Sequence, residues 1–347
     1  MAPGIIGPTT PMTILFDYSE PAVLAHGGLL TQIKQTKAAL ETLGCHVEYL
    51  RWWDETQRGD VLHYFSRAIP RHVRFAQAKG LKVVLGELLT EQGSRSGGRL
   101  WLQRQTMRLL ETVVPSGFTE SFGWESHRLA DAHVALTDWE AHLQNYLFEV
   151  PREKIRVIPN GVEDVFLQSV PAARGKWLVC TVTITERKRV LELAQAAVEA
   201  QAPLWVIGKG YSDADPYVQR FLELARAHPQ VLRYEGALED RAKLAQAYRE
   251  SRGFVLLSAC ESLSLSALEA AACECPLLLS DLPWARTTFK DRATYCPLAG
   301  STASTAAILR RFYDAAPQLP KPPRPLSWLE VAKQVKALYE SLAPTGR

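Results

Sequence analysis

Two glutamates with a defined spacing are the residues of this sequence best suited to bind a polar ligand. Glu261 follows an apolar run at 253–260, and Glu269 comes eight residues later, within a predicted helix at 267–273. Because Glu261 precedes that helix, both carboxylates can approach its N-terminus. Backbone N–H groups and the helix dipole favour a phosphate there, and carboxylates accept hydrogen bonds from sugar hydroxyls. The combination suits a nucleotide sugar, whereas the bare spacing alone is more typical of solvated surface acids.

Composition and charge restrict the class of protein. The chain has 347 residues, of which 47% are hydrophobic and 22% charged, so it suits two domains and excludes a disordered or fibrous protein. The formal net charge is +3, which predicts no nucleic-acid partner. No apolar run approaches the ~20 residues that a membrane helix needs, and the first residues lack the pattern of a signal peptide. We therefore expect a cytoplasmic protein.

Apolar segments of strand length alternate with segments of helical period, which predicts parallel sheets with crossover helices. Strands are expected at 12–18, 46–52, 60–65, 81–86, 133–137 and 155–158, and then at 177–184, 204–207, 231–234, 254–258 and 277–280. The predicted helices include 29–43, 189–200, 216–227, 240–250, 267–273 and 328–342. The sequence therefore predicts an α/β protein with two units of one design.

Two breaks interrupt this alternation. The pattern lapses after the turn dipeptide Asn160-Gly161, and a Pro-rich stretch at 317–325 forms a second connector. We expect domains at 1–165 and 166–325, followed by a C-terminal segment, 326–347, that contains the last helix.

Several segments, in chain order, resemble the retaining glycosyltransferases of family 4. The spacing of Glu261 and Glu269 is similar to the E-x7-E motif of that family. The other similar segments are Gly27-Gly28, the strand at 60–64, the run KIRVIPNGVE at 154–163, the continuation at 276–281 and the closing segment at 327–339. The resemblance covers nearly the whole chain, which a single short motif could not do.

The resemblance implies a fold and an activity. The fold would be GT-B, with two Rossmann-like α/β domains whose parallel sheets face each other across a cleft and a last helix that returns to the first domain. The activity would be retaining transfer of a sugar from a nucleotide-diphosphate sugar to a sugar, a lipid-linked molecule or another small acceptor. The resemblance implies neither a cofactor nor an obligatory metal.

The resemblance also implies roles for single residues of the donor site. Glu261 would contact the transferred sugar, Glu269 would bind the ribose, and Lys188 would bind the diphosphate and stabilise the leaving group. Further donor-site candidates are Arg187, Arg189, Gly27, Gly28, Ser264, Leu265 and Gly208. The family often has an arginine where this chain has Thr183, and Arg187 or Arg189 is expected to compensate. A solvated helix start is the alternative interpretation of the basic run at 187–189.

The acceptor side departs from the family pattern. Many relatives have a histidine after the fourth strand, and this chain has Glu87 and Glu91 in that region instead. We expect His26 to lie near the reacting sugar, and Glu87 or Glu91 to serve the acceptor or to be a buried, paired structural acid. The stretch 67–108 holds nine basic and two acidic residues, which predicts contact with an anionic membrane or an acidic acceptor. The alternative there is a core helix with a solvated basic face.

Other motifs point away from competing chemistries. Asp213-Ala-Asp215 precedes Pro216 and predicts a helix N-cap rather than a metal site, and the histidines lack the spacing of metal ligands. Two further functions stay open on the same architecture: a catalytically silent subunit that binds nucleotide, which Thr183, the missing histidine and the segment 284–286 favour, and an epimerase or phosphorylase, for which only the fold argues.

Overall fold

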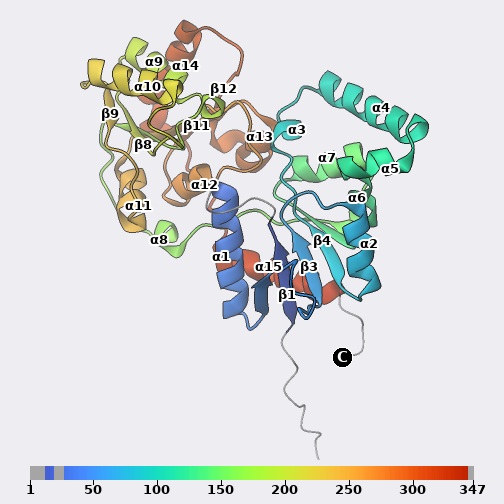
Figure 1. Ribbon diagram of the computed structural model, residues 1–347. Helices are drawn as coiled ribbons and strands as arrows, with labels where there is room; N and C mark the ends of the chain where they lie inside the picture. The colour runs from blue at the N-terminus through green and yellow to red at the C-terminus, as the bar shows by residue number, and fades with distance from the viewer. Residues whose placement is uncertain (1–11, 19–26, 343–347) are drawn as a thin grey trace, which may run out of the picture.

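The computed structural model describes residues 12–18 and 27–342. Within these residues the chain forms two parallel six-stranded sheets, each with helices on both faces (Figure 1). Parallel sheets of this kind are buried on both sides, which explains why strands such as Val61–Tyr64 and Leu277–Ser280 are buried at every position.

The first sheet has the strand order β2-β1-β3-β4-β5-β6. Its strands are β1 (Thr13–Asp17), β2 (His46–Tyr49), β3 (Val61–Tyr64), β4 (Lys82–Leu85), β5 (Ala132–Ala135) and β6 (Ile155–Val157). Helices α1 (Gly28–Thr42) and α15 (Trp328–Leu342) share one apolar cluster with this sheet, and α2 (Pro70–Ala78) shares another. The remaining helices of this half are α3 (Thr90–Gly93), α4 (Gly97–Val113), α5 (Ser116–Thr119), α6 (Trp124–Leu129) and α7 (Asp138–Phe148).

The second sheet has the order β12-β11-β10-β7-β8-β9. Its strands are β7 (Leu178–Thr181), β8 (Leu204–Ile207), β9 (Leu232–Tyr234), β10 (Gly253–Leu256), β11 (Leu277–Ser280) and β12 (Thr294–Cys296). One apolar cluster joins it to α9 (Val190–Glu199), α10 (Pro216–Ala227) and α14 (Thr302–Ala315). The other joins it to α8 (Asp164–Leu167), α11 (Arg241–Glu250), α12 (Leu265–Ala272) and α13 (Pro283–Phe289).

Side-chain caps fix the starts of the helices that matter for the site. Ser264 accepts a hydrogen bond from the backbone of Ala267 at the start of α12, and Asp240 accepts two at the start of α11. Asp215 caps α10, as its position before Pro216 predicts. Thr137 caps α7, but Glu140 extends away from the cap and accepts hydrogen bonds from the backbone of Leu136 and Leu89.

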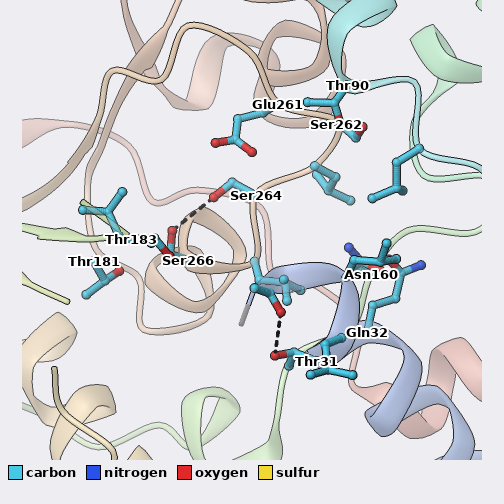
Figure 2. Close-up of a pocket in the computed structure, with 18 of the residues that line it drawn as sticks. Thr31, Gln32, Thr90, Asn160, Thr181, Thr183, Glu261, Ser262, Ser264 and Ser266 are labelled. Carbon is cyan, nitrogen blue, oxygen red and sulfur yellow. Dashed lines mark hydrogen bonds between the residues drawn. The ribbon is translucent and has the colours of Figure 1, made fainter. Parts of the chain in front are cut away.

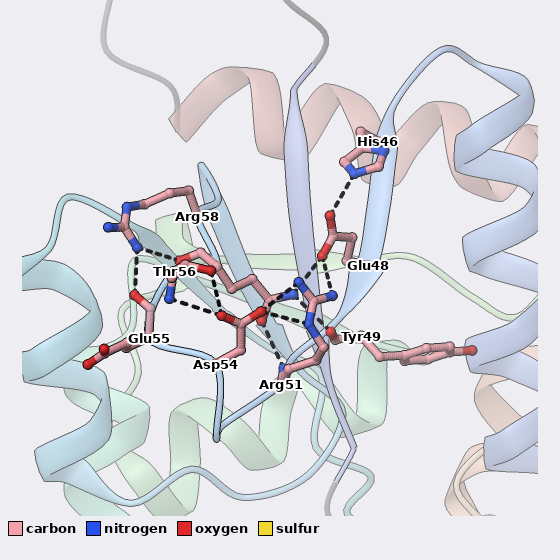
Figure 3. Close-up of polar contacts among 9 residues, drawn as sticks. His46, Glu48, Tyr49, Arg51, Asp54, Glu55, Thr56 and Arg58 are labelled. Carbon is pink, nitrogen blue, oxygen red and sulfur yellow. Dashed lines mark hydrogen bonds and ion pairs between the residues drawn. The ribbon is translucent and has the colours of Figure 1, made fainter.

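The edge strand β2 is shorter than its sequence predicts because a polar network shapes the turn after it (Figure 3). Arg51 donates to Glu48 and Asp54 over 2.6 and 3.0 Å, and the backbone N–H of Arg51 donates to Gln57. Hydrogen bonds from Gln57, His46 and Arg51 hold the pKa of Glu48 at about 2. Charged side chains on an edge strand also discourage pairing with other chains.

The chain crosses between the two sheets in two neighbouring segments. Val162 forms a parallel bridge with Ser327, and the backbone N–H of Trp328 donates to the carbonyl of Val162. A Cβ atom on Gly161 would lie 2.7 Å from the backbone nitrogen of Trp328, so only glycine permits this approach. Helix α15 then packs against α1 beside the first sheet (Figure 1).

Candidate functional site

A pocket of about 500 Å³ lies between the two halves of the molecule (Figure 2). Its walls come from the start of α1, the segment after β4, the end of β7 and the segment that runs from Glu261 into α12. The carboxyl ends of parallel strands commonly form ligand sites in α/β proteins, because the connecting loops gather there.

Two helix N-termini, one from each half, meet at this pocket. Helix α1 begins at Gly28 after Gly27, helix α12 begins at Leu265 after Ser264, and all four residues line the pocket. A Cβ atom on Gly28 would lie 3.5 Å from the Leu265 side chain, whereas Gly27 faces open space. Backbone N–H groups and aligned dipoles at the two helix starts favour an anion between them.

Lys188 and Glu261 form an ion pair on the second-sheet side of the pocket. Lys188 ends a short 3-10 turn, 186–188, that precedes α9, and it meets Glu261 from 73 residues away in the sequence. The guanidinium of Arg187 lies 3.6 Å from the same carboxylate and also donates to the carbonyl of Cys260. The two cations and the carboxylate thus stand together beside the N-terminus of α12.

Glu269 lies in the same pocket with both carboxylate oxygens occupied. Arg241 pairs with one oxygen, and the hydroxyl of Tyr248 donates to the other over 3.1 Å. Burial raises the pKa of Glu269, and the charge and hydrogen bond of Arg241 act in the opposite direction. Burial and the neighbouring Glu269 charge raise the pKa of Tyr248, which stays a hydrogen-bond donor.

Two predicted donor-site residues do not line this pocket. Arg189 has left-handed backbone with φ of 52°, and its side chain donates to the carbonyl of Leu298. The turn between the 3-10 segment and α9 therefore sends it away from Lys188. Gly208 lines a neighbouring hollow of about 190 Å³ that shares Thr181 with the main pocket. A Cβ atom at Gly208 would lie 1.8 Å from the carbonyl oxygen of Val182, which explains the glycine.

Two of the predicted acceptor-side residues, Glu87 and Glu91, also do not line the pocket. Glu87 accepts hydrogen bonds from Arg67 and lies 3.1 Å from His127. Burial acts to raise its pKa, but these two partners prevail and bring the pKa to about 2, so Glu87 is a paired acid in this structure. Glu91 is exposed and lies 3.9 Å from Arg95. His26 lies outside the described residues.

The pocket also contains residues that the sequence analysis did not identify as site residues. Arg241 and Asn160 line it, and Thr90 reaches it from α3. The hydroxyl of Thr90 lies 2.7 Å from that of Ser262, which follows Glu261. Asn160 could have been identified from the sequence, because it belongs to the run at 154–163 that resembles the family. Arg241 could not, because an arginine directly after a capping aspartate is typical of an ordinary solvated helix start.

The basic stretch 67–108 does not form one free cationic surface. Most of its cations have partners in the structure: Arg67 with Glu87, Arg74 with Glu125, Lys82 with Asp131, Arg95 with Glu91, Arg108 with Glu149, and Arg104 over the ring of Tyr146. Helix α4 buries Leu100 and Met107 and exposes Trp101, Leu102, Leu109 and Val113. The helix therefore exposes these apolar side chains together with the basic Arg99 and Arg108.

The described residues contain neither a helix suited to span a membrane nor a cluster of side chains suited to bind a metal ion. Over 12–18 and 27–342, no helix is both long enough and apolar enough to cross a bilayer. In the same part of the chain, no three side chains of His, Cys, Asp or Glu are grouped as metal ligands would be.

Comparison with known families supports a glycosyltransferase. The family described as glycosyl transferases, group 1, matches residues 175–314, a range that contains Lys188, Glu261 and Glu269. Comparison with curated proteins gives no match.

Solved structures establish the fold. A glycosyltransferase from Rickettsia africae superposes with a TM-score of 0.64 at 13% identity, over 97% of this chain and 100% of that one. HepE from Anabaena, in complex with UDP-glucose, gives 0.61 at 14% identity over 95% and 100%. Sucrose-phosphate synthase from Thermosynechococcus elongatus gives 0.62 at 16% identity over 96% and 99%. The predicted two-domain GT-B fold is confirmed.

Proposed function

We propose that the protein is a retaining, metal-independent glycosyltransferase of family 4 that moves a sugar from a nucleotide-diphosphate sugar to an acceptor. The observation that carries this proposal is the meeting of Lys188, Glu261 and Glu269 in one pocket where two helix N-termini converge. Such a pocket offers positive charge for a diphosphate and carboxylates for the hydroxyls on either side of it.

In this proposal the diphosphate lies between the starts of α1 and α12, with Lys188 and Arg187 beside it. The bond between the sugar C1 and the phosphate oxygen breaks, and the acceptor oxygen bonds to C1 from the same face. The leaving phosphate takes the acceptor's proton, so no protein base is required. The cations and helix dipoles stabilise the charge on the leaving group, which is the part that a divalent metal plays in other sites.

In this arrangement the two glutamates accept hydrogen bonds from the hydroxyls of the transferred sugar and of the ribose. Glu261 is held beside Lys188, at the sugar end, and Glu269 is deeper in the second half, at the ribose end. UDP is the first donor nucleotide to test, since HepE was solved with UDP-glucose. Domains at 1–165 and 166–325, with the segment 326–347 belonging with the first, are part of the same proposal.

We also propose that the acceptor enters from the first-sheet side, and that α4 contacts an anionic membrane that supplies a lipid-linked acceptor. The exposed Trp101, Leu102, Leu109 and Val113 would enter the lipid interface. Arg99 on α4 has no ion-pair partner within 12–18 and 27–342 and would remain at the headgroups. Co-sedimentation with phosphatidylglycerol vesicles at low salt tests this contact, and a protein that stays in solution contradicts it.

The donor assignment is tested by thermal shift with UDP, GDP, ADP and their sugar conjugates, together with Glu269→Ala. Ligand at 100 times Kd stabilises the native state by about 2.7 kcal/mol. We expect one nucleotide to raise the melting temperature, and the variant to lose most of that shift. A chain that no nucleotide stabilises, or that binds nucleotide but never releases sugar from a conjugate, would be the silent subunit that Thr183 and the missing histidine favour.

A further inference from the structure

The side chain of Arg241 in the pocket wall is held by contacts with three other residues. Its Nη2 pairs with Glu269, its Nε donates to Glu163 over 2.8 Å, and its Cζ lies 4.7 Å from the ring centre of Phe166. The residue is the first of α11, so a capped helix start holds its backbone. These contacts fix the guanidinium against one oxygen of Glu269 and leave it little freedom to turn elsewhere.

Glu269 depends on this cation. Its side chain is buried, with 8% of the residue exposed, on a helix that packs into an apolar cluster of the second half. A buried carboxylate loses hydration and tends to take up a proton unless a cation and hydrogen bonds hold it ionised. Arg241 supplies the charge together with one hydrogen bond, and Tyr248 supplies a second hydrogen bond.

We propose that Arg241 is a positioning residue that keeps Glu269 ionised and oriented for the ribose hydroxyls, and so sets the pH range over which the protein binds nucleotide. The proposal rests on the function proposed for Glu269. An ionised carboxylate accepts hydrogen bonds at both oxygens, whereas a protonated one has a donor at one of them. Without Arg241, the pKa of Glu269 would rise, and the ribose would meet a neutral acid over a wider range of pH.

The groups that face Glu269 from its neighbours agree with this assignment. Helix α11 presents Arg241 and Tyr248, the segment before α8 presents Glu163, and the end of its own helix carries Cys273. The strands behind it contribute the hydroxyl of Thr181, which contacts Tyr248. Removal of Arg241 would leave Glu269 facing the like charge of Glu163, and both burial and that charge then favour the protonated form.

The test is the affinity for UDP, measured by titration calorimetry between pH 6.0 and 8.5 for the wild type, Arg241→Met and Arg241→Lys. The ratio of variant Kd to wild-type Kd at each pH removes the titration of UDP itself. We expect this ratio for Arg241→Met to exceed tenfold at pH 6.0 and to fall below threefold at pH 8.5. The Lys variant keeps a charge but cannot contact both carboxylates, so its ratio should be smaller at pH 6.0.

Arg187→Met is the matched control, because Arg187 lines the same pocket but contacts Glu261. Its ratio should show no fall as the pH rises. In a Glu269→Gln background, adding Arg241→Met should change the affinity equally at both pH values. Circular dichroism shows whether each variant is folded. If Arg241→Met does not fold, the comparison is made with Arg241→Lys instead.

Two results would separate the hypotheses. A ratio for Arg241→Met that is constant with pH, or close to one throughout, overturns the role of Arg241 while nucleotide binding by Glu269 stands. Two other outcomes overturn the proposed function and, with it, the role of Arg241. In one, the wild type and the Glu269→Gln variant bind UDP equally well. In the other, the wild type binds none of UDP, GDP and ADP.

Discussion

The hydroxyl oxygens of Thr90 and Ser262 lie 2.7 Å apart although the two residues belong to different halves of the molecule. Thr90 opens α3, which follows the strand β4 of the first sheet, and Ser262 follows Glu261 in the second half. This hydrogen bond therefore ties the two walls of the pocket together beside Glu261.

Thr90→Val should weaken nucleotide binding two- to tenfold. A neutral hydrogen bond contributes about 0.5–1.5 kcal/mol, and the pocket is complete only when its two walls stand together. Titration calorimetry measures the change. Thr90→Ser keeps the hydroxyl and serves as the control, so equal affinities for the Val and Ser variants would show that the bond does not hold the walls.

Lys188→Met should lower both turnover and stability. The diphosphate loses a cation, a change of about 3 kcal/mol in the transition state or roughly 100-fold in kcat. Glu261 loses its buried partner, and we expect about 2 kcal/mol less stability because Arg187 remains 3.6 Å away. The double variant Lys188→Met with Glu261→Gln should regain stability in urea but not turnover. Full kcat in the single variant would place the diphosphate elsewhere.

Arg174→Ala should destabilise the second half. The guanidinium donates to carbonyls at the ends of α11 and α12, the helices that carry Arg241 and Glu269; these are the carbonyls of Tyr248, Arg249, Ser251, Cys273 and Glu274. Charged hydrogen bonds contribute about 1.5–3 kcal/mol, so we expect a loss near 3 kcal/mol in urea unfolding. Arg310→Ala removes a surface pair with Asp314 and should cost less than about 1 kcal/mol.

Glu140 should make stability fall as the pH rises from 4.5 to 7. Burial raises the pKa of Glu140 to about 7, although the backbone N–H groups of Leu136 and Leu89 donate to it. In that window the folded state holds a proton that the unfolded state has released, so raising the pH favours unfolding, by an amount on the order of 2–3 kcal/mol. Above pH 7 both states are ionised and the effect is constant.

The measurement is urea unfolding of the wild type and Glu140→Gln at several pH values. Burial also lowers the pKa of His63 and His133 to about 3, and below pH 6.5 these histidines make the free energy of unfolding rise with pH. Because the wild type and the variant share this effect, the difference between the two proteins isolates Glu140. A difference that does not change between pH 4.5 and 7 would contradict the prediction.

The fold could be predicted where the local pattern and the buried environment agree. The strand Leu277–Ser280 and the helices Pro216–Ala227 and Trp328–Leu342 lie where their periodicity places them. Strand β12 was not predicted, since it has three residues and two of them are only half-buried. Helix α14 was also missed, because its first turn is rich in Thr and Ser, which favour caps and turns.

The site could be predicted only where its residues carry a motif. Glu261, Glu269 and Lys188 stand in recognisable runs, and the structure brings all three to one pocket. The pairing of Arg241 with Glu269 spans 28 residues and depends on how α11 packs against α12, which no local pattern encodes. Arg189 looked equivalent to Arg187 in the sequence, but a single left-handed residue turns its side chain to Leu298.

The bridge between Val162 and Ser327 has a consequence for motion. The segment that leaves the first half at Val162 and the segment that returns to it at Ser327 lie side by side. Both connections between the halves therefore follow one line, which can act as a hinge axis. Rotation about that line changes the gap between the starts of α1 and α12 while the hydrogen bonds within each sheet stay intact. In the proposed function, such a rotation would let the donor enter and would close the pocket over it without disturbing either core.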